Sequence, residues 1–91
     1  MAGKASATID FGATPVAEAS FTITDANITA TTVVEPFMLV DSTADNDAEA
    51  HRHAAASWKM VALPASGSFT LYVTSLIDLC WGTFKVQYAY A

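Results

Sequence analysis

Histidines and carboxylates gather in one segment of the chain, and their types are those that bind metal ions. His51 and His53 lie two residues apart, close to the acidic residues Asp41, Asp45, Asp47 and Glu49. Imidazole nitrogens and carboxylate oxygens are common zinc ligands. On a helix, however, side chains two positions apart point to different faces, so both histidines can bind one ion only in an extended segment or with ligands from a second subunit. We therefore expect no metal and no other cofactor, and a zinc ion shared between subunits is the alternative.

The spacing of the same residues is typical of pairs on a helix surface. His51 follows Asp47 by four positions, and His53 follows Glu49 by four, so each pair would be solvated and would contribute about 0.2–0.5 kcal/mol. A calcium loop of the EF-hand type needs oxygen ligands at alternate positions and a glycine at its sixth position, and this segment has neither. We expect its carboxylates to cap a helix and to favour its N-terminal dipole.

Nucleophilic residues occur without the neighbours that would activate them. Ser57 and Cys80 can be combined with His53 and Asp47, but no glycine of a nucleophile elbow flanks a serine and no further residue would orient a base. We therefore expect that the protein is not an enzyme. Cys80 follows a leucine and precedes a tryptophan, which is typical of a small buried apolar residue.

Charge and length exclude several classes of protein. The 91 residues suffice for one domain, and nine acidic against four basic residues give a net charge of −5. Nucleic-acid binding needs clustered lysine and arginine, so we expect no nucleic-acid partner. No run of eighteen apolar residues predicts a membrane span, and residues 1–6 lack the apolar stretch of a signal peptide. We expect a protein made in a cytoplasm, without a membrane partner.

Alternation of apolar and polar residues predicts an all-β fold, a single antiparallel β-sandwich of about six strands. The alternation is clearest in residues 81–91, where Phe84, Val86, Tyr88 and Tyr90 fall on one face. The other predicted strands are residues 7–11, 17–24, 31–40, 58–63 and 69–74. The apolar run 76–80 fits either a loop or an early start of the last strand, and residues 64–67 are predicted to form a turn. We expect residues 1–6 to be a short N-terminal arm and residues 7–91 to be the single domain.

One helical insertion is predicted at about residues 46–55, where alanines and charges replace β-branched residues. Asn46 with Glu49 three positions later resembles a capping box, and Thr43 or Asp45 is the alternative N-cap.

Four residues are candidates for an interface with other protein. Pro36 cannot donate a ladder hydrogen bond, so its strand should lie at an edge or contain a bulge. Tyr72 is opposite in phase to Phe69 and Leu71, which predicts an exposed ring, and with Trp58 or Trp81 it could contact a subunit or stack on a sugar. Lys4 lies in the predicted arm. The candidate interface residues are therefore Lys4, Pro36, Tyr72 and Trp81.

Several short motifs together resemble a family of small virion proteins and domains of tailed bacteriophages. The motifs span nearly the whole chain: Ala7-Thr-Ile-Asp-Phe-Gly12 with Pro15, Glu35-Pro-Phe, Asp41-Ser-Thr-Ala-Asp-Asn with Glu49-Ala-His51, Gly67-Ser-Phe-Thr-Leu-Tyr, and Gly82-Thr-Phe-Lys-Val-Gln-Tyr-Ala-Tyr. The order of the last two strands also looks like the H-type lectin fold, a six-stranded sandwich that assembles as trimers. No carbohydrate-binding residue matches position by position.

The resemblance implies a structural component of the virion, made in the cytoplasm of the bacterial host. It implies either a capsid decoration or cement protein, which binds the major capsid protein as a homotrimer and stabilises the shell, or a receptor-binding module of a tail or fibre. A free-standing small domain favours the decoration role. On this interpretation the arm with Lys4 would add a strand to the capsid protein. An interaction domain unrelated to viruses is a third interpretation.

Overall fold

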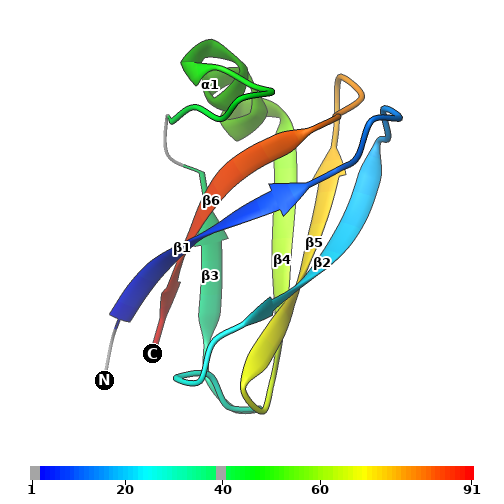
Figure 1. Cartoon of the computed structure of the whole chain (residues 1–91). Helices are drawn as coiled ribbons and strands as arrows, with labels where there is room; N and C mark the ends of the chain where they lie inside the picture. The colour runs from blue at the N-terminus through cyan, green and yellow to red at the C-terminus, as the bar shows by residue number, and fades with distance from the viewer. Residues whose placement is uncertain (1–2, 39–40) are drawn as a thin grey trace.

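The computed structural model describes residues 3–38 and 41–91, and in these residues two antiparallel sheets pack face to face (Figure 1). One sheet has the strand order β1-β6-β3 and the other has the order β2-β5-β4. The predicted all-β sandwich of about six strands with one short helix is confirmed. The elements are β1 (Gly3–Asp10), β2 (Glu18–Thr24), β3 (Val34–Phe37), α1 (Ala48–Ser57), β4 (Trp58–Ala65), β5 (Ser68–Ser75) and β6 (Thr83–Tyr90).

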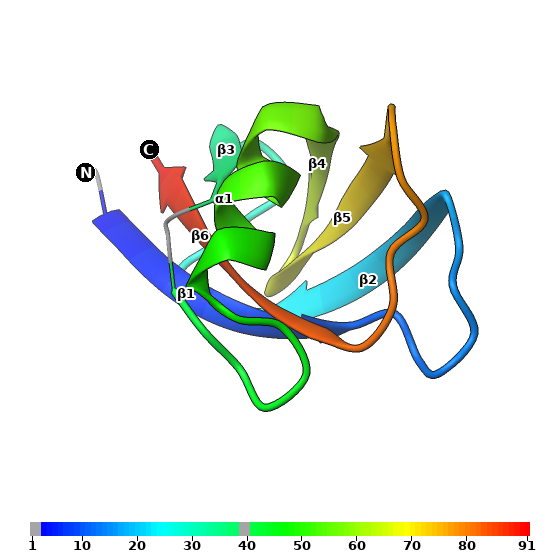
Figure 2. The same cartoon turned by 90° about the horizontal axis from the view of Figure 1, so that it is seen from above.

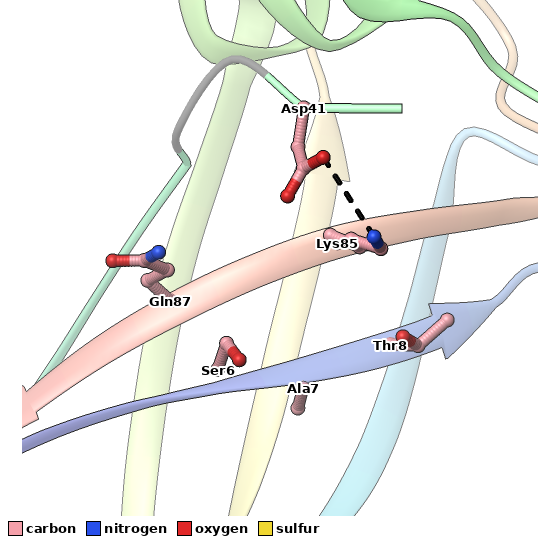
Figure 3. Close-up of a pocket in the computed structure, with 6 residues that line it drawn as sticks. All are labelled: Ser6, Ala7, Thr8, Asp41, Lys85 and Gln87. Atoms are coloured by element: carbon pink, nitrogen blue, oxygen red, sulfur yellow. Dashed lines mark ion pairs between the residues drawn. The ribbon is translucent and has the colours of Figure 1, made fainter. Parts of the chain in front are cut away.

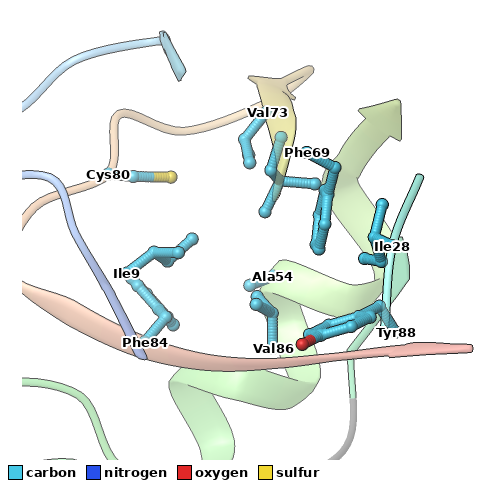
Figure 4. Packing of buried hydrophobic residues seen from close by; sticks show 10 residues of the cluster. Ile9, Ile28, Ala54, Phe69, Val73, Cys80, Phe84, Val86 and Tyr88 are labelled. Atoms are coloured by element: carbon cyan, nitrogen blue, oxygen red, sulfur yellow. The ribbon is translucent and has the colours of Figure 1, made fainter. Parts of the chain in front are cut away.

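The central strands β5 and β6 supply most of the core because their alternate residues are large and apolar. Phe69, Leu71 and Val73 of β5 are almost fully buried and face the buried residues of β6. Figure 4 shows Phe69 and Val73 on one side of this core and Phe84, Val86 and Tyr88 on the other. The predicted alternation of the last strand is confirmed, and the buried apolar set is Ile9, Ile28, Ala54, Phe69, Leu71, Val73, Cys80, Phe84, Val86 and Tyr88.

The two edge strands β3 and β4 lie close together and each contains a proline (Figures 1 and 2). Val33 and Ala91 form a hydrogen-bonded pair, and such pairs alternate with non-hydrogen-bonded pairs along the β3–β6 ladder. Pro36 therefore lies at a non-hydrogen-bonded position, where its backbone nitrogen faces away from β6. The bond from Leu76 to Ser57 likewise places Pro64 with its backbone away from β5. A missing N–H is tolerated at such positions, so the prediction of an edge strand at Pro36 is confirmed.

Four expectations about the bounds of secondary-structure elements differ from the structure. Residues Gly3–Ser6, expected as an arm, form the first half of β1 and pair with residues 87–90 of β6. The predicted turn at residues 64–67 is shorter, because Pro64 and Ala65 extend β4. The helix spans Ala48–Ser57 instead of 46–55, and its N-cap is Asp47, whose Oδ1 accepts from the Ala50 N–H at 2.9 Å. The predicted third strand is confined to Val34–Phe37, with residues 39–40 outside the described part.

The apolar run 76–80 is a loop between β5 and β6. Cys80 forms an isolated antiparallel bridge with Val16, which ties this loop to the loop after β1. No helix in the described part of the chain is long and apolar enough to cross a membrane.

Candidate interaction surfaces

The segment before and within α1 covers the part of β6 that β3 does not reach. β3 pairs with β6 only as far as Gln87, and the ladder turns the backbone groups of Lys85 and Thr83 toward the same side. His51 Nε2 accepts from the Lys85 N–H at 3.0 Å. Side chains from this segment therefore satisfy strand groups that would otherwise be buried without partners.

Asn46, Thr43 and Asp45 complete this contact. The Asn46 side-chain amide donates to the carbonyls of Trp81 at 2.9 Å and Thr83 at 2.8 Å, and the Thr43 hydroxyl donates to the Thr83 carbonyl at 2.8 Å. The Asp45 carboxylate accepts from the Thr83 N–H at 2.9 Å. Asn46 thus holds the strand, and the capping role expected of it belongs to Asp47.

His51 is fully buried, so the expected solvated pair with Asp47 is wrong. Its Nδ1 bonds to the Asp47 backbone carbonyl at 2.9 Å, while Nε2 accepts from Lys85. A carbonyl only accepts and an amide N–H only donates, so this geometry requires the neutral Nδ1–H tautomer. Both ring nitrogens are occupied by the protein. His53 is exposed, and its Nε2 lies 3.7 Å from Glu49, as the spacing predicts.

No three histidine, cysteine or acidic side chains converge on a metal-sized site within the described ranges. The Cys80 thiol is buried and accepts from the Trp58 Nε1–H at 3.1 Å, as expected for a structural cysteine.

The loop after β5 forms the first exposed apolar surface, which we call the end cluster: Leu76, Ile77, Leu79 and Trp81. These side chains are 46–77% exposed within six residues of sequence. A groove of about 330 Å³ lies between this loop and α1, lined by residues that include Ala50, His53, Trp58 and Leu79. The ring of Phe84 stacks edge-on against Trp58 at 4.9 Å and supports the groove from the core. Clustered apolar exposure of this kind marks contact surfaces for other molecules.

The outer face of the β2-β5-β4 sheet forms a second surface. Tyr72 is 46% exposed at its centre, directly opposite Ser20 of β2 and Val61 of β4. A shallow depression of about 310 Å³ runs beside the ring, between Glu18, Ser20 and Thr74. The predicted exposure of Tyr72 is confirmed, and its ring lies between hydroxyl groups on the β2 side and the exposed Val61 on the β4 side.

A third, polar depression lies on the outer face of the other sheet (Figure 3). Asp41 points toward the Lys85 amine, with an Oδ1–Nζ distance of 3.7 Å. The Ser42 N–H, at 2.8 Å, and then the Lys85 charge lower the pKa of the Asp41 carboxyl. The hydroxyls of Ser6 and Thr8 and the amide of Gln87 line the rest of this space of about 260 Å³.

The four predicted interface residues do not form one surface. Tyr72 lies on the outer face of one sheet, and Lys4 on the outer face of the other. Trp81 belongs to the end cluster, and Pro36 is half-buried in the edge strand β3. The interface candidates from the sequence did not include Leu76, Ile77 and Leu79. Three large apolar residues in a segment that fits a loop would have indicated an exposed contact surface.

Comparison with protein-family models, with curated proteins and with solved structures finds no match to this chain.

Proposed function

We propose that this chain is a structural protein of a bacteriophage virion, a head decoration protein that binds the outer surface of the capsid shell. The proposal rests on the resemblance of its sequence motifs and, in the structure, on the end cluster. Contact with another protein would bury the apolar surface of the end cluster and remove it from water, which is favourable.

The end cluster suits a contact with a large, preformed surface. Ile77 and Leu79 project from a loop at one end of the sandwich, and the groove beside them can receive a side chain of the partner. The loop is tied at Cys80 to the backbone of Val16 by two hydrogen bonds of 2.8 and 2.9 Å. A loop held in this way loses little freedom on binding.

Co-sedimentation with empty shells of the phage that carries this chain tests the proposal. Leu79→Asp should abolish shell binding, because it places a charge in the contact. Leu63→Asp is the matched control: Leu63 is 58% exposed and Leu79 is 61% exposed, but Leu63 lies on β4. Equal binding by Leu79→Asp and wild-type protein would contradict the proposal, as would density confined to the tail in images of the intact particle.

A lectin-like module of a tail or fibre is the second candidate, favoured by the surroundings of Tyr72. An exposed aromatic ring beside the Ser20 and Thr74 hydroxyls and the Glu18 carboxylate offers stacking and hydrogen bonding to a sugar. Glycan binding that is lost in Tyr72→Ala but kept in Trp81→Ala would support this function. The two rings are equally exposed, at 46% each. Comparing the two variants therefore distinguishes a sugar site at Tyr72 from nonspecific binding to any exposed aromatic ring.

A further inference from the structure

The outer edge of β1 is an unpaired strand edge. The hydrogen bond from Phe11 N–H to the Gly82 carbonyl, at 2.9 Å, sets the phase of the β1–β6 ladder. In that phase Ala5, Ala7 and Ile9 bond to β6, and the residues between them turn their backbone N–H and C=O groups away. The outward residues are Lys4, Ser6, Thr8 and Asp10. Within the described residues, no hydrogen bond outside the ladder uses these backbone groups.

Other edges of the sandwich are protected, or lack complementary charges. β3 and β4 present Pro36 and Pro64 at outward positions, and β6 is covered by the segment that contains His51. The β2 edge turns outward Glu18, Ser20, Thr22 and Thr24, which include an acidic residue and no basic one. The β1 edge carries Lys4 and Asp10 near its two ends, and neither has an ion-pair partner in the described part of the chain.

We propose that β1 pairs with β1 of a second copy of this chain, antiparallel about a two-fold axis at Ala7. Only outward residues can exchange hydrogen bonds across this edge. An outward residue must therefore lie opposite an outward residue, so the two strands can shift against each other only by an even number of residues. With Ala7 facing Ala7, Lys4 lies opposite Asp10 of the second copy and Ser6 lies opposite Thr8. The symmetry repeats both pairs, so two opposite-charge pairs and all four outward residues of each copy are used.

Neighbouring registers lose this complementarity. A shift that centres the axis on Ser6 places Lys4 opposite Thr8, and one that centres it on Thr8 places Asp10 opposite Ser6. A lysine on a strand edge ordinarily opposes strand addition. Asp10 at the symmetry-related position offsets that charge, and this selects a second copy over an unrelated strand. The product is one six-stranded sheet with the order β3-β6-β1-β1-β6-β3.

Sedimentation equilibrium of the full chain tests the pairing. The wild type should associate to twice the 9.6 kDa chain mass. Lys4→Asp replaces two attractive cross-strand pairs by two repulsive ones and should raise the dimer dissociation constant about tenfold. Lys4→Asp with Asp10→Lys restores opposite charges and should recover the dimer. Glu18→Lys, a charge reversal on the β2 edge, is the matched control and should leave the constant unchanged.

A backbone test is independent of charge. Ser6→Pro removes one outward N–H while the β1–β6 bonds remain, so it should abolish the dimer. Ser20→Pro makes the same change at an outward position of β2 and should not. Circular dichroism and thermal unfolding establish that both variants are folded. A folded wild type that is monomeric at every concentration, or that sediments as a trimer, would overturn the proposal.

Cysteine cross-linking tests the register in a Cys80→Ser background. Ala7→Cys places two thiols in a non-hydrogen-bonded pair with Cα atoms about 4.5 Å apart, within disulfide range. In this register Ala5 lies opposite Ile9 of the second copy. The two cysteines of an Ala5→Cys dimer would be four residues, or about 13 Å, apart along the strands and should stay reduced. Cross-linking of Ala5→Cys without Ala7→Cys would refute this register. The inference does not depend on the proposed capsid role.

Discussion

The Lys85 backbone N–H donates to His51 Nε2 at 3.0 Å, which joins the centre of a sheet to a helix that lies thirty-four residues earlier. Together with Asn46, Thr43 and Asp45, His51 supplies from side chains the hydrogen bonds that a neighbouring strand would supply from its backbone. The helical insertion is therefore part of the sheet's hydrogen bonding.

His51→Ala should lower the free energy of unfolding by about 2–4 kcal/mol, because it leaves a cavity and an unpaired Lys85 N–H. His51→Phe fills the space without an acceptor, so its cost isolates the hydrogen bond. The control is His53→Ala on the exposed side of α1, with an expected change within about 0.5 kcal/mol. Denaturant unfolding measures all three, and faster amide exchange at Lys85 should accompany both His51 variants. Unchanged exchange there would contradict the assigned bond.

Asn46→Asp should destabilise the fold more than Asn46→Ala. The Asn46 amide donates to two carbonyls, and a carboxylate at that place would face the Trp81 and Thr83 oxygens with like partial charge. We expect about 1–3 kcal/mol for the alanine variant and a larger loss for the aspartate variant. Asp47→Ala removes only the N-cap and should cost about 1 kcal/mol. Thermal unfolding ranks the three, and an aspartate variant as stable as Asn46→Ala would show that the amide is not the donor.

Gly82→Ala should be more destabilising than Gly67→Ala. Both glycines have positive φ, +71° at Gly82 and +76° at Gly67, so each substitution carries a backbone cost of about 1–2 kcal/mol. An added Cβ at Gly67 meets nothing within 4 Å, whereas one at Gly82 would lie 2.7 Å from the Asp45 Cβ. The excess of about 1 kcal/mol or more in denaturant unfolding measures this contact. Equal losses would mean that Asp45 moves away at no cost.

Stability should fall at both ends of the pH range because of the pair formed by Tyr88 and Asp25. The Tyr88 hydroxyl donates to Asp25 Oδ2 at 2.6 Å. This bond and then the Asn27 N–H lower the pKa of the Asp25 carboxyl, so its contribution is present above about pH 4 and is lost as the pH falls further. Burial and then Asp25 raise the pKa of Tyr88, so its contribution is present below about pH 10 and is lost as the pH rises beyond that value.

Tyr88→Phe tests this pH dependence. It should lower stability near neutral pH and flatten both the acid and the alkaline decline, measured as unfolding midpoints across the pH range. Tyr72→Phe, which changes an exposed ring, is the control. A Tyr88→Phe profile parallel to that of the wild type would contradict the pairing.

The strands were predictable from sequence because their alternation is local. Phe69, Leu71 and Val73 on one strand, and the aromatic series of β6 on another, can bury a face only as strands. The edge position of Pro36 followed from its missing donor. The first half of β1 was missed because Gly3 and Ala5 have low strand propensity, and pairing with β6 overrides that propensity.

The hydrogen bonds to β6 could not be predicted in the same way. Asn46 and His51 bond to backbone groups of residues 81–85, and a backbone group has no sequence signature. Their neighbours in sequence favoured a capping box and solvated pairs, which are local alternatives with the same residue types. The exposed end cluster was missed because an apolar run reads equally well as a buried strand.

The position of β6 between β1 and β3 also determines when the fold can form. Gly3 pairs with Tyr90, so one sheet is closed by residues from opposite ends of the described chain. During synthesis on a ribosome, β1 has no strand partner until β6 has emerged. The side chains of Asn46 and His51 likewise have no hydrogen-bond partners until residues 81–85 have emerged. The sheet therefore cannot close before β6 has emerged, and pairings of such long sequence separation place small β-proteins in the slow millisecond-to-second folding range. Until then residues 3–10 have no partner strand, and unpaired strand segments of this kind favour aggregation.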